Sequence, residues 1–345
     1  MDVMISLSRR FLTKDNNSNT LVENIITTIC NQYPGAHFYL LSYDNKQYKF
    51  SLPGNVQTII AAIPFFLRPI TKWIYQRKLK ALVKKFNAQI LLHINDYIPV
   101  NAATTYLLLT SVTNSKPNQL NKLDGIITSS LSIKNELVKN NIDPSRIRII
   151  QSMAPNIYQP LDWDTREQSK EYFSEGKEYF LFNASGASHT NFLNVLKGFS
   201  AVKKWLKSGI RLIIVNMETG KRTENLLNTY KYKSDITISA TISNADYPKL
   251  AGAALAFIYL PQFDSNGLPL VEAMQCGVPV ITWHNNIFFE LGNDAVLYVE
   301  PNNEQDIGEK MMKIYKDEKT RTVLIQKSLL QLQTLATHNT AAILE

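Results

Sequence analysis

The feature that most constrains the fold of this chain is a regular alternation between two hydrophobic patterns. Short runs rich in Val, Ile, Leu and Phe, for example residues 3–7, 179–183 and 254–259, are separated by longer stretches whose apolar residues recur at helical spacing. Parallel strands need such a crossover between them, whereas antiparallel strands can be joined by a tight turn. The alternation therefore predicts an α/β protein whose parallel sheets are covered by helices.

The same patterns place the individual elements. In the first half we predict helices at residues 20–32, 70–86 and 132–140, and strands at residues 3–7, 37–42, 89–94, 125–128 and 148–151. In the second half we predict strands at residues 179–183, 211–216, 236–239, 254–259, 278–282 and 295–299. A polar, Pro-containing stretch at residues 154–178 separates the two series.

A chain of 345 residues is long enough for two α/β domains of ordinary size. We predict an N-terminal Rossmann-like domain at residues 1–155, a linker at 156–178 and a C-terminal Rossmann-like domain at 179–319. Residues 320–345 are predicted to form a helix that returns to the N-terminal domain. Parallel sheets bind ligands at the carboxyl ends of their strands, so the cleft between the domains is the expected active site.

The composition is typical of a folded protein that stays inside the cell. Hydrophobic residues make up 45% and charged residues 19% of the chain, which excludes a disordered or fibrous protein. Cys30 and Cys276 lie in apolar stretches of opposite halves, so we expect no disulfide and a reducing compartment. Asp2 stands where a signal peptide would carry positive charge, and we therefore expect a cytoplasmic location.

The net charge of +8 comes from one stretch. Residues 45–95 contain nine Lys or Arg and no Asp or Glu. Within it, the apolar run at the start of residues 59–86 is far shorter than the ~20 residues that a membrane-spanning helix needs. The stretch is therefore not predicted to cross a bilayer.

After this run, the apolar residues Ile70, Trp73, Ile74 and Ala81 recur at helical spacing. Basic residues lie largely on the rest of the helix surface, among them Lys78, Lys80, Lys84 and Lys85. Two interpretations stay open: a helix that lies on an anionic membrane surface at the inner face, or a solvated basic face of a core helix. No nucleic-acid recognition motif accompanies the charge, so nucleic-acid binding is not expected.

The most informative stretch for function follows the predicted strand at 254–259. Its Gly267-Leu268-Pro269 turn leads into a helical run, and Pro is favoured in the first turn of a helix. Free backbone N–H groups around Gly267 and Leu268, together with the helix dipole, are expected to bind a phosphate or a sugar oxygen.

Two carboxylates lie at opposite ends of this element. Asp264 is on the loop and Glu272 is on the helix. A ligand along the start of the helix would meet both, Asp264 through a sugar hydroxyl and Glu272 through a ribose diol.

The run D-S-N-G-L-P-L-V-E-A-M-Q-C-G-V-P-V-I, which begins at Asp264, resembles the motif of the retaining glycosyltransferases with the GT-B fold, called glycosyltransferase group 1. The family pattern is E-G-F-G-L-P-x-x-E-A-M-x-C-G-x-P-V-I. Downstream, E-L-G-N-D-A-V-L-Y-V-E-P from Glu290 is similar to the family's E-x-x-G-D-A-x-L-x-V-x-P. Residues 125–160 resemble the family's first domain more weakly, so the likeness covers most of the chain.

This resemblance implies two Rossmann-like domains that face each other across a cleft, and transfer of a sugar from a nucleotide diphosphate with retention at the anomeric carbon. Glu272 would bind the donor ribose, and Asp264 would contact the transferred sugar. Asn266, Gly267 and Leu268 would hold sugar and phosphate through backbone groups, and Ile242 lies in the part that is similar to the family's nucleobase cover. Ser185, Gly186 and Thr190 stand in the loop where the family carries basic residues, and they are predicted to donate hydrogen bonds to the diphosphate instead.

The chain departs from the family pattern at several of these positions. Asp264 stands where the family usually has Glu, and Thr190 stands at the position of a Lys that neutralises the diphosphate. In the first domain Asn95 replaces a His that points at the reacting sugar, which leaves Asp96 as the better candidate for an acceptor contact. Asn95 and Asp96 are nevertheless predicted, with Asp264, to be catalytic.

The Gly-rich loop of many relatives is also absent after the first strand. Arg9 and Arg10 occupy this place and are candidates for an acceptor phosphate, although solvation at a helix start explains them equally well. Asp162-Trp163-Asp164 matches a metal-binding Asp-x-Asp motif of another glycosyltransferase fold, but it lies in the predicted linker and is interpreted as solvated. No metal or other cofactor is expected.

The sequence thus predicts a glycosyltransferase that uses a UDP- or GDP-sugar on a carbohydrate or lipid-linked acceptor, in the assembly of a surface polysaccharide. A nucleotide-sugar 2-epimerase has a similar architecture but would need no acceptor. A catalytically degenerate partner subunit is a third hypothesis, because three family positions are replaced.

Overall fold

The computed structural model describes residues 1–7, 16–42, 52–60, 71–100, 103–110, 117–151, 153–217, 221–239, 242–262, 264, 266–338 and 343–344. These residues form two compact units. Unit 1 comprises Met1–Ser152 and Ala336–Glu345, and unit 2 comprises Met153–Leu335. Each unit contains one parallel sheet, which confirms the predicted fold class of two Rossmann-like domains.

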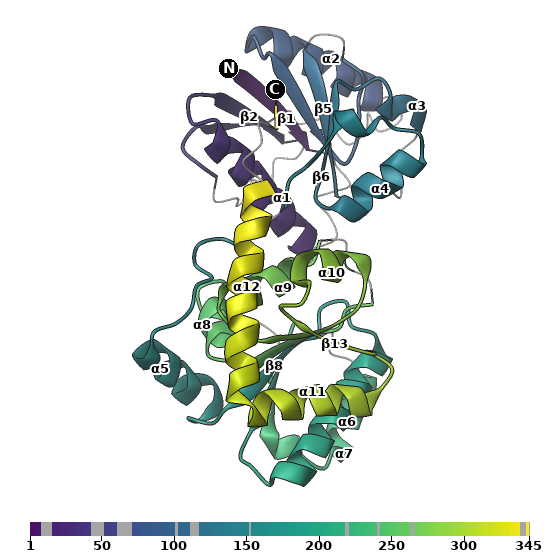
Figure 1. Ribbon diagram of the computed structural model, residues 1–345. Helices are drawn as coiled ribbons and strands as arrows, with labels where there is room; N and C mark the ends of the chain where they lie inside the picture. Colours follow the sequence, from purple (N-terminus) through teal and green to yellow (C-terminus); the bar gives the residue numbers. More distant parts are fainter. Residues whose placement is uncertain are drawn as a thin grey trace. The chain divides into compact units, whose positions relative to one another are not determined.

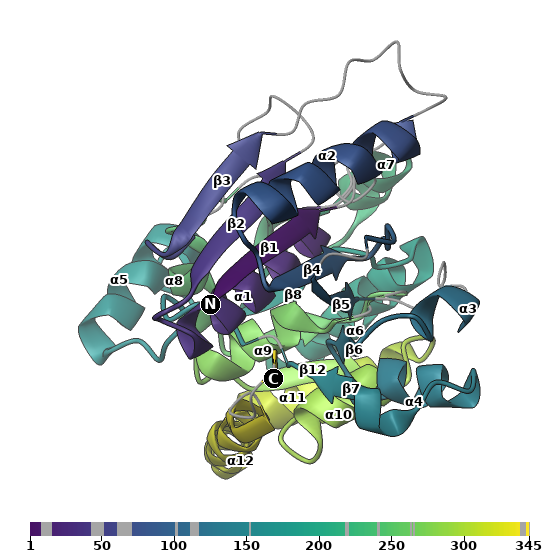
Figure 2. The same cartoon turned by 90° about the horizontal axis from the view of Figure 1, so that it is seen from above.

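Unit 1 has a seven-stranded sheet in the order β3-β2-β1-β4-β5-β6-β7, with every neighbouring pair parallel (Figure 2). Its strands are β1 Asp2–Leu7, β2 His37–Ser42, β3 Val56–Ile60, β4 Ile90–Ile94, β5 Thr104–Leu109, β6 Gly125–Thr128 and β7 Ile147–Ile149. Its helices are α1 Asn16–Gln32, α2 Thr71–Lys85, α3 Pro117–Leu120 and α4 Leu131–Lys139, with a 3-10 turn at Pro144–Arg146.

The strands of unit 1 bury both faces, because helices cover each side. In β1, Val3 and Ile5 point into a core that includes Ile25 of α1, whereas Met4 points to the opposite face and packs with Leu79 of α2. This two-residue alternation lets a continuous apolar strand supply two cores.

Unit 2 has a six-stranded parallel sheet in the order β10-β9-β8-β11-β12-β13. Its strands are β8 Tyr179–Asn183, β9 Arg211–Val215, β10 Ile236–Ser239, β11 Ala256–Tyr259, β12 Val280–Trp283 and β13 Leu297–Val299. Its helices, labelled in Figure 1, are α5 Trp163–Ser174, α6 His189–Leu206, α7 Lys221–Thr229, α8 Tyr247–Gly252, α9 Leu268–Gln275, α10 Asn286–Gly292, α11 Glu304–Lys316 and α12 Glu318–His338, with a 3-10 turn at Lys233–Asp235.

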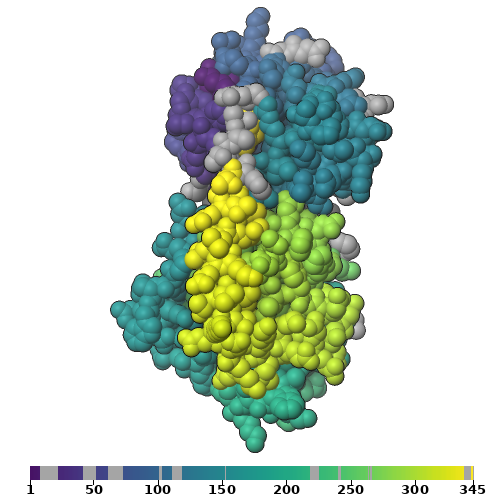
Figure 3. Space-filling view, in the orientation of Figure 1, coloured from purple at the N-terminus to yellow at the C-terminus, as the bar shows by residue number. Residues whose placement is uncertain are grey.

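Two helical layers cover the sheet of unit 2. Tyr179 and Leu181 of β8 point toward α8, α9 and α10, and Phe180 and Phe182 point toward α6 and α11. The long helix α12 forms a continuous ridge on the surface of unit 2 (Figure 3) and packs through Leu332 and Leu335 on the same core as α9. The helices α8 and α9 follow β10 and β11 in the chain, so each begins on the side of the sheet where the strands end, and the loops there carry several of the predicted donor residues.

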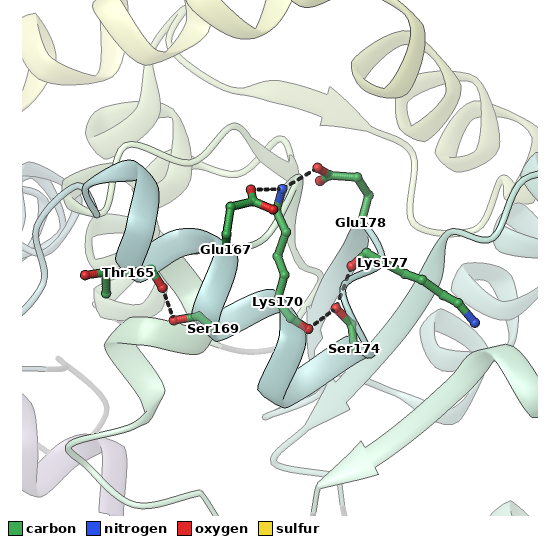
Figure 4. A network of polar contacts seen from close by, with 7 residues as sticks. All are labelled: Thr165, Glu167, Ser169, Lys170, Ser174, Lys177 and Glu178. Atoms are coloured by element: carbon green, nitrogen blue, oxygen red, sulfur yellow. Dashed lines mark hydrogen bonds and ion pairs between the residues drawn. The ribbon is translucent and has the colours of Figure 1, made fainter.

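The stretch that the sequence predicts as a linker, residues 156–178, contains α5. Asp162 begins this helix, because its carboxylate accepts a hydrogen bond from the Thr165 N–H at 2.9 Å. Farther along, the buried Lys170 ammonium lies between Glu167 at 2.8 Å and Glu178 at 2.6 Å (Figure 4). These contacts fix α5 to the start of β8, and by its contacts the whole stretch belongs to unit 2.

Near the C-terminus the chain also contributes to unit 1. Ile343 and Leu344 are buried in the core on the α1 side of the sheet. The Arg148 guanidinium donates to the Ile343 carbonyl at 2.5 Å, and the Leu344 N–H donates to the Tyr33 hydroxyl at 3.0 Å. The two residues therefore belong to unit 1 although α12 packs on unit 2.

Candidate functional site

The start of α9 is built around a glycine in a left-handed conformation. Gly267 precedes the helix with φ of +62°, and a Cβ placed there would lie 2.4 Å from the Leu291 Cδ1. Both the backbone angle and the lack of space favour glycine. Pro269 then occupies the first turn of the helix, as the sequence predicted.

Asp264 is held by two hydrogen bonds from the protein. Its Oδ2 accepts from the Tyr259 hydroxyl at 2.9 Å, and its Oδ1 accepts from the Asn266 N–H at 2.9 Å. The Asn266 Oδ1 in turn accepts from the Leu268 N–H at 3.0 Å. The Leu268 N–H therefore has an internal partner and reaches a ligand only when the Asn266 side chain moves aside.

Glu272 lies on α9 with only 8% of its surface exposed. Burial raises the pKa of its carboxyl group to about 8, and a hydrogen bond from the Tyr158 hydroxyl opposes this rise. Among the residues that the structure describes, no Lys or Arg forms an ion pair with it. A buried carboxylate whose main polar neighbours are hydroxyl groups is suited to accept hydrogen bonds from the hydroxyls of a ligand.

Polar side chains surround this carboxylate. The rings of Tyr158 and Tyr247 meet edge to face with centroids 6.3 Å apart. Asn183, at the carboxyl end of β8, donates from its Nδ2 to the Tyr247 hydroxyl at 3.1 Å. Burial, and to a lesser degree the negative charge of the nearby Glu272, raise the pKa values of the Tyr158 and Tyr247 hydroxyls.

The loop between β8 and α6 is tied into the same region. The Ser185 N–H donates to the Asn183 Oδ1 at 3.0 Å, and the Gly186 carbonyl accepts from the Gln262 N–H at 2.7 Å. Gly186 has φ of +67° and is exposed, and Thr190 is exposed in the first turn of α6. The bond to Gln262 joins this loop to the one that carries Asp264.

Ile242 is half-buried and packs against the core below α8 and α9. Unit 2 thus brings Asp264, Asn266, Gly267, Leu268, Glu272 and Ile242 to the elements that pack on one core. Ser185 and Gly186 lie on the adjoining loop, and Thr190 lies in the first turn of α6.

A pocket of about 340 Å³ opens beside this loop and is lined by Ser188, Thr190, Asn191, Pro261, Gln262, Trp283, Pro301 and Asn302. Of the predicted site residues it includes only Thr190. Neither Asp264 nor Glu272 lines this pocket. The candidate site is therefore defined by the contacts of these two carboxylates and not by the pocket.

The candidates in unit 1 lie after β4. Asn95 adopts φ of +57°, donates to the Thr110 Oγ1 at 2.9 Å and accepts from the Thr110 N–H at 2.9 Å. Asp96 is exposed. His93 is fully buried beside Tyr97, and burial lowers the pKa of its imidazole to about 4, so it is neutral at pH 7. Asn95 therefore stabilises the end of β5, in addition to the catalytic role that the sequence predicts for it.

The basic residues predicted to contact a membrane lie on the exposed side of α2. Tyr75, Leu79 and Val83 are buried against the sheet, so α2 is a core helix. The Arg77 guanidinium lies 4.7 Å from the ring centroid of Trp73, which is 57% exposed. All four predicted lysines are exposed, namely Lys78, Lys80, Lys84 and Lys85.

The predicted apolar stripe of this helix, which included Trp73 and Ala81, is not the face that packs on the core, since both residues are exposed. Within the described residues, no helix is both long and apolar enough to cross a bilayer. Arg9 and Arg10 lie outside the described residues.

The same described residues contain no group of three or more His, Cys, Asp or Glu side chains placed to hold a metal ion. Asp162 of the Asp-x-Asp match instead caps α5, as described above. Cys30 and Cys276 are both buried free thiols.

Sequence reasoning missed three tyrosines and one asparagine of the site: Tyr158, Tyr247, Tyr259 and Asn183. Asn183 and Tyr259 are the last residues of β8 and β11. Polar groups at the carboxyl ends of adjacent parallel strands are a signal that could have identified both.

Comparison with solved structures confirms the GT-B fold. The chain is similar over 99% of its length to a glycosyltransferase from Rickettsia africae, with a TM-score of 0.76 and 14% identity over 99% of that chain. It is also similar to Anabaena Alr3699/HepE in complex with UDP and glucose, with a TM-score of 0.70 and 13% identity over 98% of this chain and 97% of that chain.

The sequence comparisons identify the family. Residues 164–330 match the family described as "Glycosyl transferases group 1". This match confirms the resemblance to glycosyltransferase group 1 that the motif at Asp264 carries.

Two curated relatives are O-antigen chain mannosyltransferases. Mannosyltransferase B of Escherichia coli is 31% identical over 98 residues, 28% of this chain and 26% of the relative. RfbU of Salmonella typhimurium is 27% identical over 184 residues, 52% of this chain and 48% of the relative. The chain thus spans between about a quarter and about half of these relatives' length.

Proposed function

We propose that this chain is a retaining glycosyltransferase that moves a hexose from a nucleotide diphosphate to a carbohydrate or lipid-linked acceptor. The observation that carries the proposal is the placement of Asp264 and Glu272 on either side of the Gly267 turn. Asp264 accepts a hydrogen bond from the Tyr259 hydroxyl, and Glu272 is buried, yet each carboxylate keeps further lone pairs for a ligand.

Within this proposal Glu272 accepts hydrogen bonds from the ribose diol of the donor, and Asp264 contacts the transferred sugar. Ile242 lies beside the nucleobase. The diphosphate contacts the backbone at Gly186 and Gly267 and the hydroxyls of Ser185 and Thr190. Hydrogen bonds from fixed donors stabilise the charge that develops on the leaving diphosphate.

The family and the relatives support a nucleotide-sugar donor and a polysaccharide product. The Anabaena structures contain UDP and UDP-glucose, and the curated relatives are O-antigen mannosyltransferases. A UDP- or GDP-hexose is therefore the proposed donor, and assembly of a surface polysaccharide is the proposed context.

A thermal-shift screen of the protein and its Glu272→Ala variant against UDP, GDP, ADP, CMP and their common sugars tests the donor site. A ligand at ~100 times its dissociation constant adds about 2.7 kcal/mol to the unfolding free energy. We expect one nucleotide family to stabilise the wild type and to lose its effect in the variant. Stabilisation by none of them would contradict the donor site and favour a degenerate subunit.

The selected donor is then incubated with and without candidate acceptors, and the free nucleotide diphosphate is measured. A transferase requires an acceptor for steady release and gives a product with the anomeric configuration of the donor. Rapid release without acceptor, together with an epimerised sugar, would instead support the 2-epimerase alternative.

The exposed face of α2 suits an anionic membrane surface, where a lipid-linked acceptor is found. An exposed aromatic ring beside several cations is typical of helices that lie at a bilayer interface. We place the enzyme at the inner membrane face for this reason.

Replacing Lys78, Lys80, Lys84 and Lys85 by Gln should remove binding to vesicles that contain anionic lipid. The matched control replaces four exposed lysines of unit 2 and changes the net charge equally: Lys204, Lys249, Lys316 and Lys319. Equal binding by the two variants in a flotation assay would contradict a role for this face.

A further inference from the structure

Tyr259 is fixed in the core of unit 2 at the end of β11. The residue is 2% exposed, and its ring packs against that of Phe288 on α10 with centroids 5.8 Å apart. Its backbone is held as well, because the Thr282 Oγ1 of β12 donates to the Tyr259 carbonyl at 2.8 Å. The hydroxyl of Tyr259 therefore has a defined place relative to the sheet.

From this place the hydroxyl reaches the loop that carries the motif. It donates to the Asp264 Oδ2 at 2.9 Å, while the Asn266 N–H donates to the Asp264 Oδ1 at 2.9 Å. One donor belongs to the last residue of β11, and the other belongs to the stretch that precedes α9. The two bonds, one at each oxygen, together restrict rotation of the carboxylate.

The restricted carboxylate is still able to bind a ligand. An ionised carboxylate offers about four lone-pair sites, of which these two bonds use only a part. A phenol that donates to an ionised carboxylate forms a charge-assisted hydrogen bond, which is stronger than a bond between neutral groups. Burial, and to a lesser degree the charge of Asp264, raise the pKa of the Tyr259 hydroxyl, so it stays protonated and donates at neutral pH.

Tyr179 provides a comparison within the same core. It is also buried, at the start of β8, and its hydroxyl donates to the Leu250 carbonyl of α8 at 2.6 Å. That bond joins the sheet to a helix and involves no carboxylate. The two tyrosines thus have similar surroundings, but only Tyr259 directs its proton at a side chain of the motif.

We propose that Tyr259 is a positioning residue of the donor site, whose hydroxyl holds the Asp264 carboxylate in the orientation that meets a hydroxyl of the transferred sugar. This inference rests on the proposed function, which assigns the sugar contact to Asp264. Without the phenol, only the Asn266 N–H would restrain the carboxylate, and the carboxylate would rotate away from the sugar. The nucleotide would be unaffected, because the proposed function places its ribose at Glu272.

The discriminating readout is the affinity for a nucleotide sugar relative to that for the nucleotide alone. Loss of a merely structural tyrosine would lower the stability of the fold or weaken both ligands together. Loss of a residue that positions Asp264 would weaken only the ligand that carries the sugar. The ratio of the two dissociation constants therefore separates a positioning role from a structural one.

The experiment measures the dissociation constants of UDP-glucose and GDP-mannose, and of UDP and GDP, by calorimetry at pH 7.5. The proteins compared are the wild type, Tyr259→Phe, Tyr179→Phe, Asp264→Ala and the double variant Tyr259→Phe/Asp264→Ala. Tyr179→Phe is the matched control, since it also removes a buried, hydrogen-bonded hydroxyl from this core. Thermal unfolding without ligand checks that each protein is folded.

We expect Tyr259→Phe to weaken binding of the nucleotide sugar about fivefold to tenfold and to change binding of the nucleotide by less than about twofold. Tyr179→Phe should leave the ratio unchanged. In the Asp264→Ala background, Tyr259→Phe should have no further effect on the ratio, because it acts through the missing carboxylate.

Three results would overturn the inference: an unchanged ratio in a folded Tyr259→Phe protein, an equal change in Tyr179→Phe, or a full effect of Tyr259→Phe in the Asp264→Ala background. Failure of the wild type to bind either nucleotide sugar would instead count against the proposed function.

Discussion

At the scale of single residues, the molecule keeps a carboxyl group in a place where its charge is costly. Glu272 is buried without an ion-pair partner in the described residues, and its pKa is raised from 4.5 to about 8. A raised acid pKa means that the folded state binds the proton more tightly than the unfolded state. The stabilisation of the folded state that comes from this tighter proton binding is complete below pH 4.5. It is lost as pH rises through 8.

Glu272→Gln should therefore stabilise the ligand-free protein at alkaline pH. The amide mimics the neutral acid at every pH, so the gain is expected to be a few kcal/mol at pH 9 and to vanish near pH 5. Thermal unfolding across this range measures it, with Glu309→Gln on an exposed position of α11 as the control. A gain that does not change with pH would show that burial of the charge is not its cause.

Asn95 combines a left-handed backbone with a side chain that makes three hydrogen bonds with Thr110. Alanine loses all three bonds and fits the positive φ poorly, so we expect Asn95→Ala to lower the unfolding free energy by about 2–3 kcal/mol. In a double-mutant cycle with Thr110→Val, much of this loss should appear as a coupling free energy between the two positions. Additive effects in denaturant titrations would contradict the contact and leave only the proposed catalytic role.

The residues of the site differ in how far the sequence reveals them. Asp264, Gly267 and Glu272 lie within one short motif, so their spacing alone predicts a shared site. Tyr158 meets α9 across 117 residues of sequence, as its carbonyl bond to Gln275 shows. No local pattern predicts such a contact, because it depends on how the chain returns over the sheet.

At the scale of elements, the start of α9 depends on the conformation of one glycine. Gly267→Ala adds a Cβ close to Leu291 and requires a positive φ that alanine adopts poorly. We expect a loss of about 2–4 kcal/mol and weaker nucleotide binding as the helix start shifts. Gly209→Ala is the control, since a Cβ there meets only ordinary contact at 3.7 Å from Lys177. If both variants lost the same unfolding free energy in denaturant titrations, the left-handed turn at Gly267 would have no special importance for stability.

The helix α5 carries a buried cation that joins it to β8. Replacing Lys170 by Met leaves Glu167 and Glu178 without their partner, but both side chains are about 40% exposed. The expected loss is therefore about 1–2 kcal/mol, below that of a fully buried pair. Adding Glu178→Gln should restore part of it in urea titrations. A further loss in the double variant would show that Glu178 has another partner.

The elements that the sequence predicted best are the central strands. Strands β1, β2, β4, β6 and β8 follow the predicted ranges closely, because both of their faces are buried and their composition is almost wholly apolar. The hydrophobic pattern did not predict β3 or β5. The residues of β3 are half-buried or exposed, as expected at a sheet edge, and β5 begins with two threonines. In both cases pairing within the sheet, rather than composition, forms the strand.

At the scale of the whole molecule, sequence order and structural units do not coincide. The chain passes from unit 1 into unit 2 at residue 153 and contributes its last described residues to unit 1 again. Ile343 and Leu344 are 1% and 4% exposed, so each fills space in the unit 1 core as fully as a central strand residue does. Unit 1 is therefore complete only when the C-terminal residues are in place.

Replacing Ile343 and Leu344 by Ala should destabilise unit 1 selectively. Two buried large-to-small changes cost about 4–8 kcal/mol together, and the loss acts on the core shared with α1 and β1. Hydrogen exchange followed by mass spectrometry should show faster exchange in β1, β2 and α1, and unchanged protection in β8 and β11. The control, Leu330→Ala on α12, alters a side chain that is 64% exposed and should change neither unit. Equal loss of protection in both units would mean that they unfold together, and the C-terminal residues would then stabilise the donor site of unit 2 as well.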